Sequence, residues 1–223
     1  MRTLSFIFSV LLLTRLTSTA QVKQIKDSTE EKIRITAVRV SGDIVNIIKS
    51  NIVSDFSGWE GAVDIELKNY YPILEFGSWS SDVSLENGQY TNNGNFWRLG
   101  VDVNLLKKDP VKNSLFFGIR YGRSVYDERL DYTITTTEFG SVSKSLENHS
   151  MKAGFAELTT GLRVKIVSGF WMGYTGRLKF APGVDKSKQL QTYDVPGYGL
   201  TYKQPWWGFN YYLMWKLNFK RKS

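Results

Sequence analysis

The stretch from Trp207 to Phe219 alternates strictly between two kinds of side chain. From Phe209 onward one parity holds only large apolar or aromatic residues, and the other holds Asn210, Lys216 and Asn218. A period of two over this length is the pattern of a β-strand with one apolar and one polar face. A strand of this kind that ends in an aromatic residue is typical of transmembrane barrels, which face lipid outside and a polar lumen inside.

Earlier segments repeat the alternation. They lie at Val38–Ile44, Trp59–Lys68, Pro72–Trp79, Phe96–Leu106, Leu115–Tyr126, Ala156–Ile166 and Phe170–Phe180. The connections between them are alternately long and short. This is the pattern of an outer-membrane barrel with long outer loops, short periplasmic turns and both termini in the periplasm. We therefore expect an all-β fold, a single antiparallel up-and-down transmembrane β-barrel of about eight strands.

The connections carry the remaining local signals. Ile47, Ile48 and Ile52 predict a short amphipathic helical turn in the first connection. The long polar connections are expected to be loops, at Ser80–Asn95, Asp127–Lys152 and Ala181–Trp206. The last of these contains Pro196-Gly197 and ends at Trp206-Trp207, so we expect it either to pack into a fixed shape or to meet lipid headgroups.

The start of the chain has the pattern of a secretory signal peptide. Arg2 precedes an apolar core from Leu4 to Leu13, and small residues lead to Ala20, although Arg15 after the core departs from the pattern. A buried N-terminal helix is the alternative. The expected division is a signal peptide at 1–20, a flexible periplasmic lead-in at 21–32, the β-barrel at 33–219 and a basic tail at 220–223. After the leader, no apolar run approaches the ~18 residues of a spanning helix.

Composition narrows the class further. The chain has no cysteine, which excludes a disulfide-stapled module and a lipoprotein acylated on cysteine. Aromatic residues make up 14% of the sequence, as expected of a barrel with aromatic girdles. The formal net charge is +8, but the basic residues are spread through the alternating strands, so no nucleic-acid partner is expected.

The polar parity of the strands distinguishes a membrane barrel from a soluble, lipocalin-like one. It places glycine beside charged residues, which suits a narrow lumen and not a solvated surface. The glycines are Gly77, Gly100, Gly118, Gly122, Gly161 and Gly173. The inward acids would be Asp43, Glu60, Asp64, Glu66, Glu75, Asp102 and Glu157, and the inward bases Arg39, Lys68, Arg98, Arg120, Arg163, Lys165, Arg177, Lys179 and Lys216. Because such a lumen has room only for side chains, we expect an interlocked salt-bridge core, with a narrow ion path as the alternative.

Catalytic chemistry has one candidate. His149 is the only histidine, it adjoins Ser150, and Glu157 follows, so a lipid hydrolase at the barrel rim is the enzyme alternative. Adjacency in sequence does not make a triad, and we expect an exposed loop histidine and no catalytic residues. No metal or cofactor site is expected, since no His/Cys cluster, calcium loop or phosphate-binding glycine loop is present. Asn148-His149-Ser150 matches a glycosylation sequon, which is frequent by chance.

Several segments together resemble an uncharacterised family of small outer-membrane β-barrel proteins from Bacteroidota. They are V-R-V-S-G-D-I-V-N-I-I-K from Val38, F-W-R-L-G-V-D-V-N-L-L-K-K-D from Phe96, L-F-F-G-I-R-Y-G from Leu115, E-L-T-T-G-L-R-V-K-I from Glu157, Y-D-V-P-G-Y-G from Tyr193 and G-F-N-Y-Y from Gly208. The resemblance implies an outer-membrane barrel and brings no catalytic residues. The tail after Phe219, Lys220 to Ser223, departs from the terminal aromatic common in such proteins.

These observations predict a protein of the cell outer membrane with a plugged polar lumen and a structural or interaction role through its long loops. Its expected partners are outer-membrane lipid, the barrel assembly machinery and a protein met by the loops. Two alternatives stay open: the rim hydrolase that uses His149, and a soluble exported barrel that binds an apolar ligand in an apolar cavity.

Overall fold

The computed structural model describes residues 34–106, 109, 113–136, 140–184, 189–202 and 204–219. The predicted signal peptide, lead-in and basic tail lie outside these ranges, so they remain predictions. The elements are β1 (Ala37–Asp43), α2 (Ile44–Ile52), β2 (Phe56–Glu66), β3 (Tyr70–Leu85), β4 (Gly88–Asn104), β5 (Ser114–Thr136), β6 (Gly140–Val167), β7 (Phe170–Val184), β8 (Asp194–Val195), β9 (Gly199–Leu200) and β10 (Trp206–Asn218).

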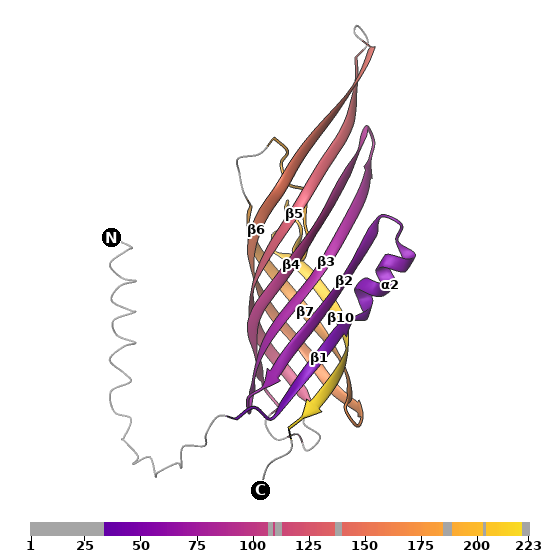
Figure 1. The fold of residues 1–223 in the computed structure, drawn as a ribbon. Helices are drawn as coiled ribbons and strands as arrows, with labels where there is room; N and C mark the ends of the chain where they lie inside the picture. The colour runs from indigo at the N-terminus through magenta and orange to yellow at the C-terminus, as the bar shows by residue number, and fades with distance from the viewer. Residues whose placement is uncertain are drawn as a thin grey trace, which may run out of the picture. The chain divides into compact units, whose positions relative to one another are not determined.

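The long strands close into a barrel in the order β1-β10-β7-β6-β5-β4-β3-β2 (Figure 1). Neighbouring barrel strands are all antiparallel, β7 pairs with β10 past the separate β8–β9 pair, and the barrel closes where β1 pairs with β10. At this seam Asp43 accepts hydrogen bonds from Asn210 Nδ2 (2.8 Å) and the Tyr211 amide (3.0 Å). The all-β class and the ring of about eight antiparallel strands are confirmed.

The two parities of each strand face opposite sides, as the sequence pattern predicts. In β4, Arg98 is 2% exposed and its neighbour Leu99 is 56% exposed. Side chains in a strand alternate between faces, so a single register fixes the whole inner set. The barrel therefore buries its charged parity and exposes its apolar parity.

Glycine on the inner face has the predicted role. A side-chain carbon added at Gly118 would collide with the carboxylate of Asp102 on the neighbouring strand. One added at Gly122 would collide with the ring of Phe155. Large side chains can cross the lumen only because small residues face them.

Two segments predicted as loops are strands instead. Ser80–Asn95 forms the end of β3, a tight turn and the start of β4. Asp127–Lys152 is mostly the paired ends of β5 and β6. In Figure 1 these hairpins rise beyond β2 and β10. Much of this extension is exposed to water on both faces, so its two faces do not differ in polarity. The strands still pair through their backbones, but without the alternation their sequence is typical of a loop.

The predicted helical turn in the first connection is confirmed as α2. Asp43 caps it by accepting a hydrogen bond from the Val45 amide at 3.1 Å, and Lys49 lies in its last turn. Ile47, Ile48 and Ile52 are exposed. No helix in the described ranges is long and apolar enough to cross a bilayer.

The connection between β7 and β10 folds back into the barrel. We call its described part, residues 189–202, the plug. Val195 and Tyr198 are fully buried and pack against Tyr126, Met151 and Phe155 of the wall. Gly197 and Gly199 have φ of 82° and 112°, which only glycine adopts readily, so the tight turn depends on them.

Candidate functional site: the charged lumen and its plug

The predicted luminal acids are all buried. At most 5% of each is exposed. Of the predicted luminal bases, Lys68 and Lys165 are exposed, which corrects their assignment; the others are buried. Lys68 lies in the β2–β3 turn with φ of 60°, and Lys165 lies close to the end of β6, so both side chains reach solvent at the rim. The buried bases are Arg39, Arg98, Arg120, Arg163, Arg177, Lys179 and Lys216.

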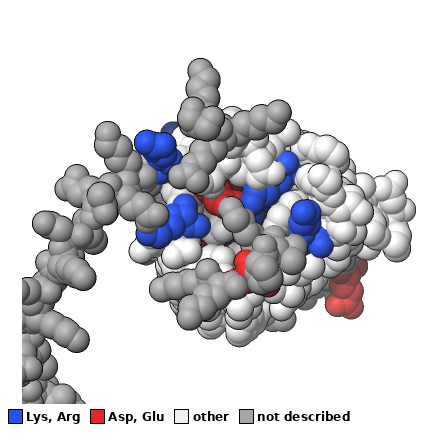
Figure 2. All heavy atoms as spheres, turned by 90° about the horizontal axis from the view of Figure 1, so that it is seen from below, with Lys and Arg blue, Asp and Glu red and all other residues white. Residues whose placement is uncertain are grey.

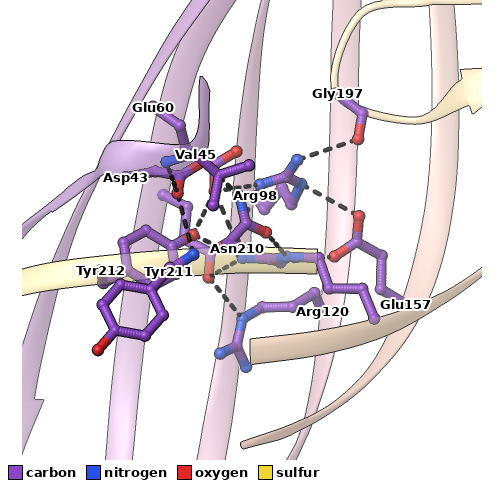
Figure 3. A network of polar contacts seen from close by, with 12 residues as sticks. Asp43, Val45, Glu60, Arg98, Arg120, Glu157, Gly197, Asn210, Tyr211 and Tyr212 are labelled. Atoms are coloured by element: carbon purple, nitrogen blue, oxygen red, sulfur yellow. Dashed lines mark hydrogen bonds and ion pairs between the residues drawn. The ribbon is translucent and has the colours of Figure 1, made fainter. Parts of the chain in front are cut away.

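The middle of the lumen is a network of arginines and carboxylates. Arg177 contacts Glu75 at 2.9 Å, Glu157 at 2.8 Å and Glu60 at 3.3 Å. Arg98 contacts the same three carboxylates at 2.8 to 3.1 Å. Figure 3 shows Arg98 and Glu157 reaching toward each other across the lumen. Both arginines and all three carboxylates of this network therefore have partners of opposite charge.

A second layer lies nearer the chain termini. Arg39 contacts Asp64 at 2.8 Å, and Lys216 pairs with Glu66. Arg163 pairs with Asp102, which also contacts Arg120 at 2.7 Å and so joins this layer to the middle network. Ion pairs therefore fill the middle of the lumen and its termini end, as the salt-bridge prediction stated, whereas the plug end holds the apolar cluster around Val195 and Tyr198.

The termini end of the barrel is basic at its rim. Figure 2, which looks at this end, shows lysine and arginine side chains around acidic atoms at the centre. The exposed bases at this end include Arg34, Lys68 and Lys165. Positive charge therefore borders the lumen where the short turns lie.

The plug is fastened to the middle network through its backbone. Lys179 Nζ donates hydrogen bonds to the carbonyls of Gly197 (2.7 Å) and Tyr198 (3.0 Å), and Arg98 donates to Gly197 O at 3.0 Å. These bonds satisfy polar backbone groups that would be costly to bury alone. Arg98 therefore binds both the luminal carboxylates and the backbone of the plug.

The plug also binds the inner face of the raised strands. Glu128 accepts hydrogen bonds from Tyr90 (2.8 Å), Asn148 (2.8 Å) and the plug residue Thr192 (2.9 Å). Only neutral donors bind this buried carboxylate in the part of the chain described. The sequence reading missed Glu128 because it placed this segment in a loop, although its parity continues that of Tyr126.

The catalytic candidates do not come together. His149 is exposed on β6, near Glu147 (3.3 Å) and Asp127 (3.7 Å). Glu157 lies in the lumen against Arg98 and Arg177, and the Ser150 amide donates to Asp127. A triad of the three predicted residues is therefore not formed.

The sequon asparagine is also inaccessible. Asn148 is 2% exposed and donates hydrogen bonds to Glu128 and to Leu190 O. Within the described ranges, no cluster of three or more His, Cys, Asp or Glu residues is placed to hold a metal ion.

Fold and lumen together define a closed antiparallel barrel with an inner core of paired charges and an inserted plug. The chain belongs to a family described as Domain of unknown function (DUF6048), which it matches over residues 2–222. No curated protein and no solved structure matched the chain. The expectation of a family without an assigned activity is thus confirmed.

Proposed function

We propose that this protein is a small outer-membrane β-barrel with a plugged polar lumen and a structural or interaction role, without catalytic activity. The observation that carries the proposal is the inversion of the usual arrangement: charges lie inside, and large apolar side chains lie outside. Leu99, Ile119, Trp215 and Leu217 are each more than half exposed. In water, exposed apolar side chains of this kind would drive the protein to associate, whereas in a membrane they would contact lipid.

The raised ends of β3 to β6 are the proposed contact surface for a protein partner. Cross-strand hydrogen bonds hold the outermost pairs, Thr133 with Ser143 (3.1 Å) and Thr135 with Ser141 (2.9 Å). Lower down, Arg129 contacts Asp131 at 2.7 Å and Glu147 at 2.9 Å. Polar, ordered strands that project beyond a membrane surface suit recognition by another protein.

The alternatives have less support. A rim hydrolase would need an acid for His149 other than Glu157, which is held by arginines. A soluble barrel that binds an apolar ligand would need an apolar cavity, whereas paired charges fill the middle of the described lumen. No nucleic-acid partner, cofactor or metal enters the proposal.

The predicted leader and the family resemblance support the same cellular setting. A chain with a signal at residues 1–20 would be exported and inserted by the barrel assembly machinery, with outer-membrane lipid as its surroundings. The resemblance to small outer-membrane proteins of Bacteroidota supports an origin in that group.

The experiment is cell fractionation followed by gel electrophoresis with and without boiling. We expect the full chain in the outer membrane, migrating differently before and after boiling because the closed barrel resists the detergent. A chain truncated before Trp206 is the matched control, since it lacks β10 and cannot close. Recovery of the full chain from the periplasm without detergent, with no mobility shift, would refute the proposal.

A further inference from the structure

A cavity of about 400 Å³ opens at the barrel end opposite the termini. It lies between α2, the starts of β2 and β10, the upper part of β3 and the plug. Its apolar lining includes Phe56, Trp79 and Trp206, and its charged lining includes Lys49 and Asp194. This size falls within the range of ordinary small-molecule sites.

Lys49 brings a positive charge without a salt-bridge partner to one wall of this cavity. Its ammonium lies 3.6 Å from the centre of the Phe56 ring. No carboxylate of the described chain lies within ion-pair distance of it. Partial burial lowers the pKa of Lys49, and the charge of Asp194, which acts from beyond contact distance, opposes this shift.

Asp194 brings a negative charge without a salt-bridge partner to the plug side. It accepts hydrogen bonds from the Ser81 hydroxyl at 3.1 Å and from Asn92 at 3.3 Å, both neutral donors. Burial raises the pKa of Asp194, and the nearest cations, Lys49 and Lys179, act on it only from beyond contact distance.

The strand register brings these two charges to the same place. Phe56 and Ser81 are paired neighbours across β2 and β3. Lys49 lies over the first and Asp194 over the second, so the opposite charges flank one cavity without forming an ion pair. The floor adds three buried charged side chains, Arg98, Lys179 and Glu60, of which Arg98 and Glu60 form an ion pair.

The wall of the cavity includes Trp79. The Trp79 indole N–H is buried and has no partner among the described residues. Its ring packs edge-on against Phe56, with ring centroids 5.7 Å apart. A buried donor without an acceptor is uncommon in proteins.

We propose that this cavity binds a small zwitterion with an apolar side chain, of the class of free α-amino acids and short peptides. The ligand carboxylate pairs with Lys49, its ammonium pairs with Asp194, and its side chain packs against Phe56 and Trp206. A ligand with only one charge would leave the other protein charge unpaired, which is unfavourable in a half-enclosed site. This binding activity goes beyond the proposed structural or interaction role and does not depend on it.

The test is a titration of the purified full chain in detergent, in which binding is measured by calorimetry and by tryptophan fluorescence. The probes are L-phenylalanine and glycyl-L-phenylalanine, with phenethylamine and 3-phenylpropionate as analogues that carry one charge each. We expect saturable binding of a zwitterion and at least about tenfold weaker binding of each single-charge analogue, since each loses one charge-assisted contact. Equal binding of an analogue, or no binding of either zwitterion to a sample that keeps its mobility shift, would overturn the proposal.

Variants locate the site. Lys49→Gln and Asp194→Asn should each weaken binding by about tenfold or more. The matched controls are Lys165→Gln, at the opposite end of the barrel, and Glu86→Gln, in the exposed β3–β4 turn, and both should bind like the parent. Should Asp194→Asn fail to fold, Lys49→Gln still decides, because Lys49 lies on α2 outside the barrel ladder; unchanged binding by that variant would refute the assignment.

Discussion

Replacing Arg177 by methionine tests the charged lumen most directly. The guanidinium is almost wholly buried and contacts Glu60, Glu75 and Glu157. Each of these carboxylates keeps Arg98 as a second partner after the change. None of the three carboxylates is therefore left without a partner in the variant. The lumen nevertheless holds one buried positive charge fewer than in the parent, so one negative charge is in excess. Breaking a buried pair on one side costs about 3–5 kcal/mol, and the remaining arginine places this case at about 3 kcal/mol.

The assay is denaturant unfolding of the purified barrel in detergent or lipid vesicles, followed by tryptophan fluorescence and gel mobility. A double variant, Arg177→Met with Glu75→Gln, removes one charge of each sign and should recover most of the lost stability. Arg129→Met is the control, because this arginine is half exposed in its ion pair with Asp131, and it should unfold like the parent. Parent-like unfolding of Arg177→Met, or no recovery in the double variant, would refute the reasoning.

Three further changes probe the outer face, the inner glycines and the plug. Leu99→Arg places a charge on the exposed apolar face and should cost up to about 2–4 kcal/mol in lipid vesicles near the bilayer midplane, whereas a soluble barrel would show no loss of stability. Gly118→Ala should sharply reduce the yield of heat-modifiable barrel, because its methyl group collides with Asp102, and a normal yield would show that the lumen can expand. Lys179→Met removes one of the two donors to Gly197 O and the donor to Tyr198 O, and it should increase protease cleavage of the plug while the barrel keeps its mobility shift; equal cleavage rates would mean that other contacts hold the plug.

The barrel and its inner face could be read from the sequence because one rule, the strand period of two, fixes both. Once Arg98 is assigned to the inner parity, Gly100 and Asp102 follow on the same strand. The ends of the strands could not be read in this way. Beyond the apolar band the two faces of β5 and β6 lose their contrast, so the last strand residues, such as Thr133, resemble a loop in composition.

The pairing inside the lumen could not be read either. Arg177 and Glu60 are 117 positions apart, and nothing in the local sequence selects Glu60 over another acid. The plug depends on the same long-range information, because Lys179 of β7 and Arg98 of β4 meet at Gly197 only after the barrel has closed. The cavity beside α2 could not be predicted from local sequence at all. Lys49 and Asp194 flank it only because the β2–β3 register and the folding of the plug into the barrel place them there.

The seam between β1 and β10 also sets an order of events during folding. The bond between Asp43 and Asn210 joins positions 167 residues apart. Bringing together the ends of so long a segment carries a length-dependent entropy cost of about 4.5 kcal/mol, whereas the other barrel pairings join strands that follow each other or span shorter connections. The hairpins can therefore form first, and β10 completes the ring last. Until then the chain presents two unpaired strand edges, and the interval before closure is when it is most exposed to aggregation.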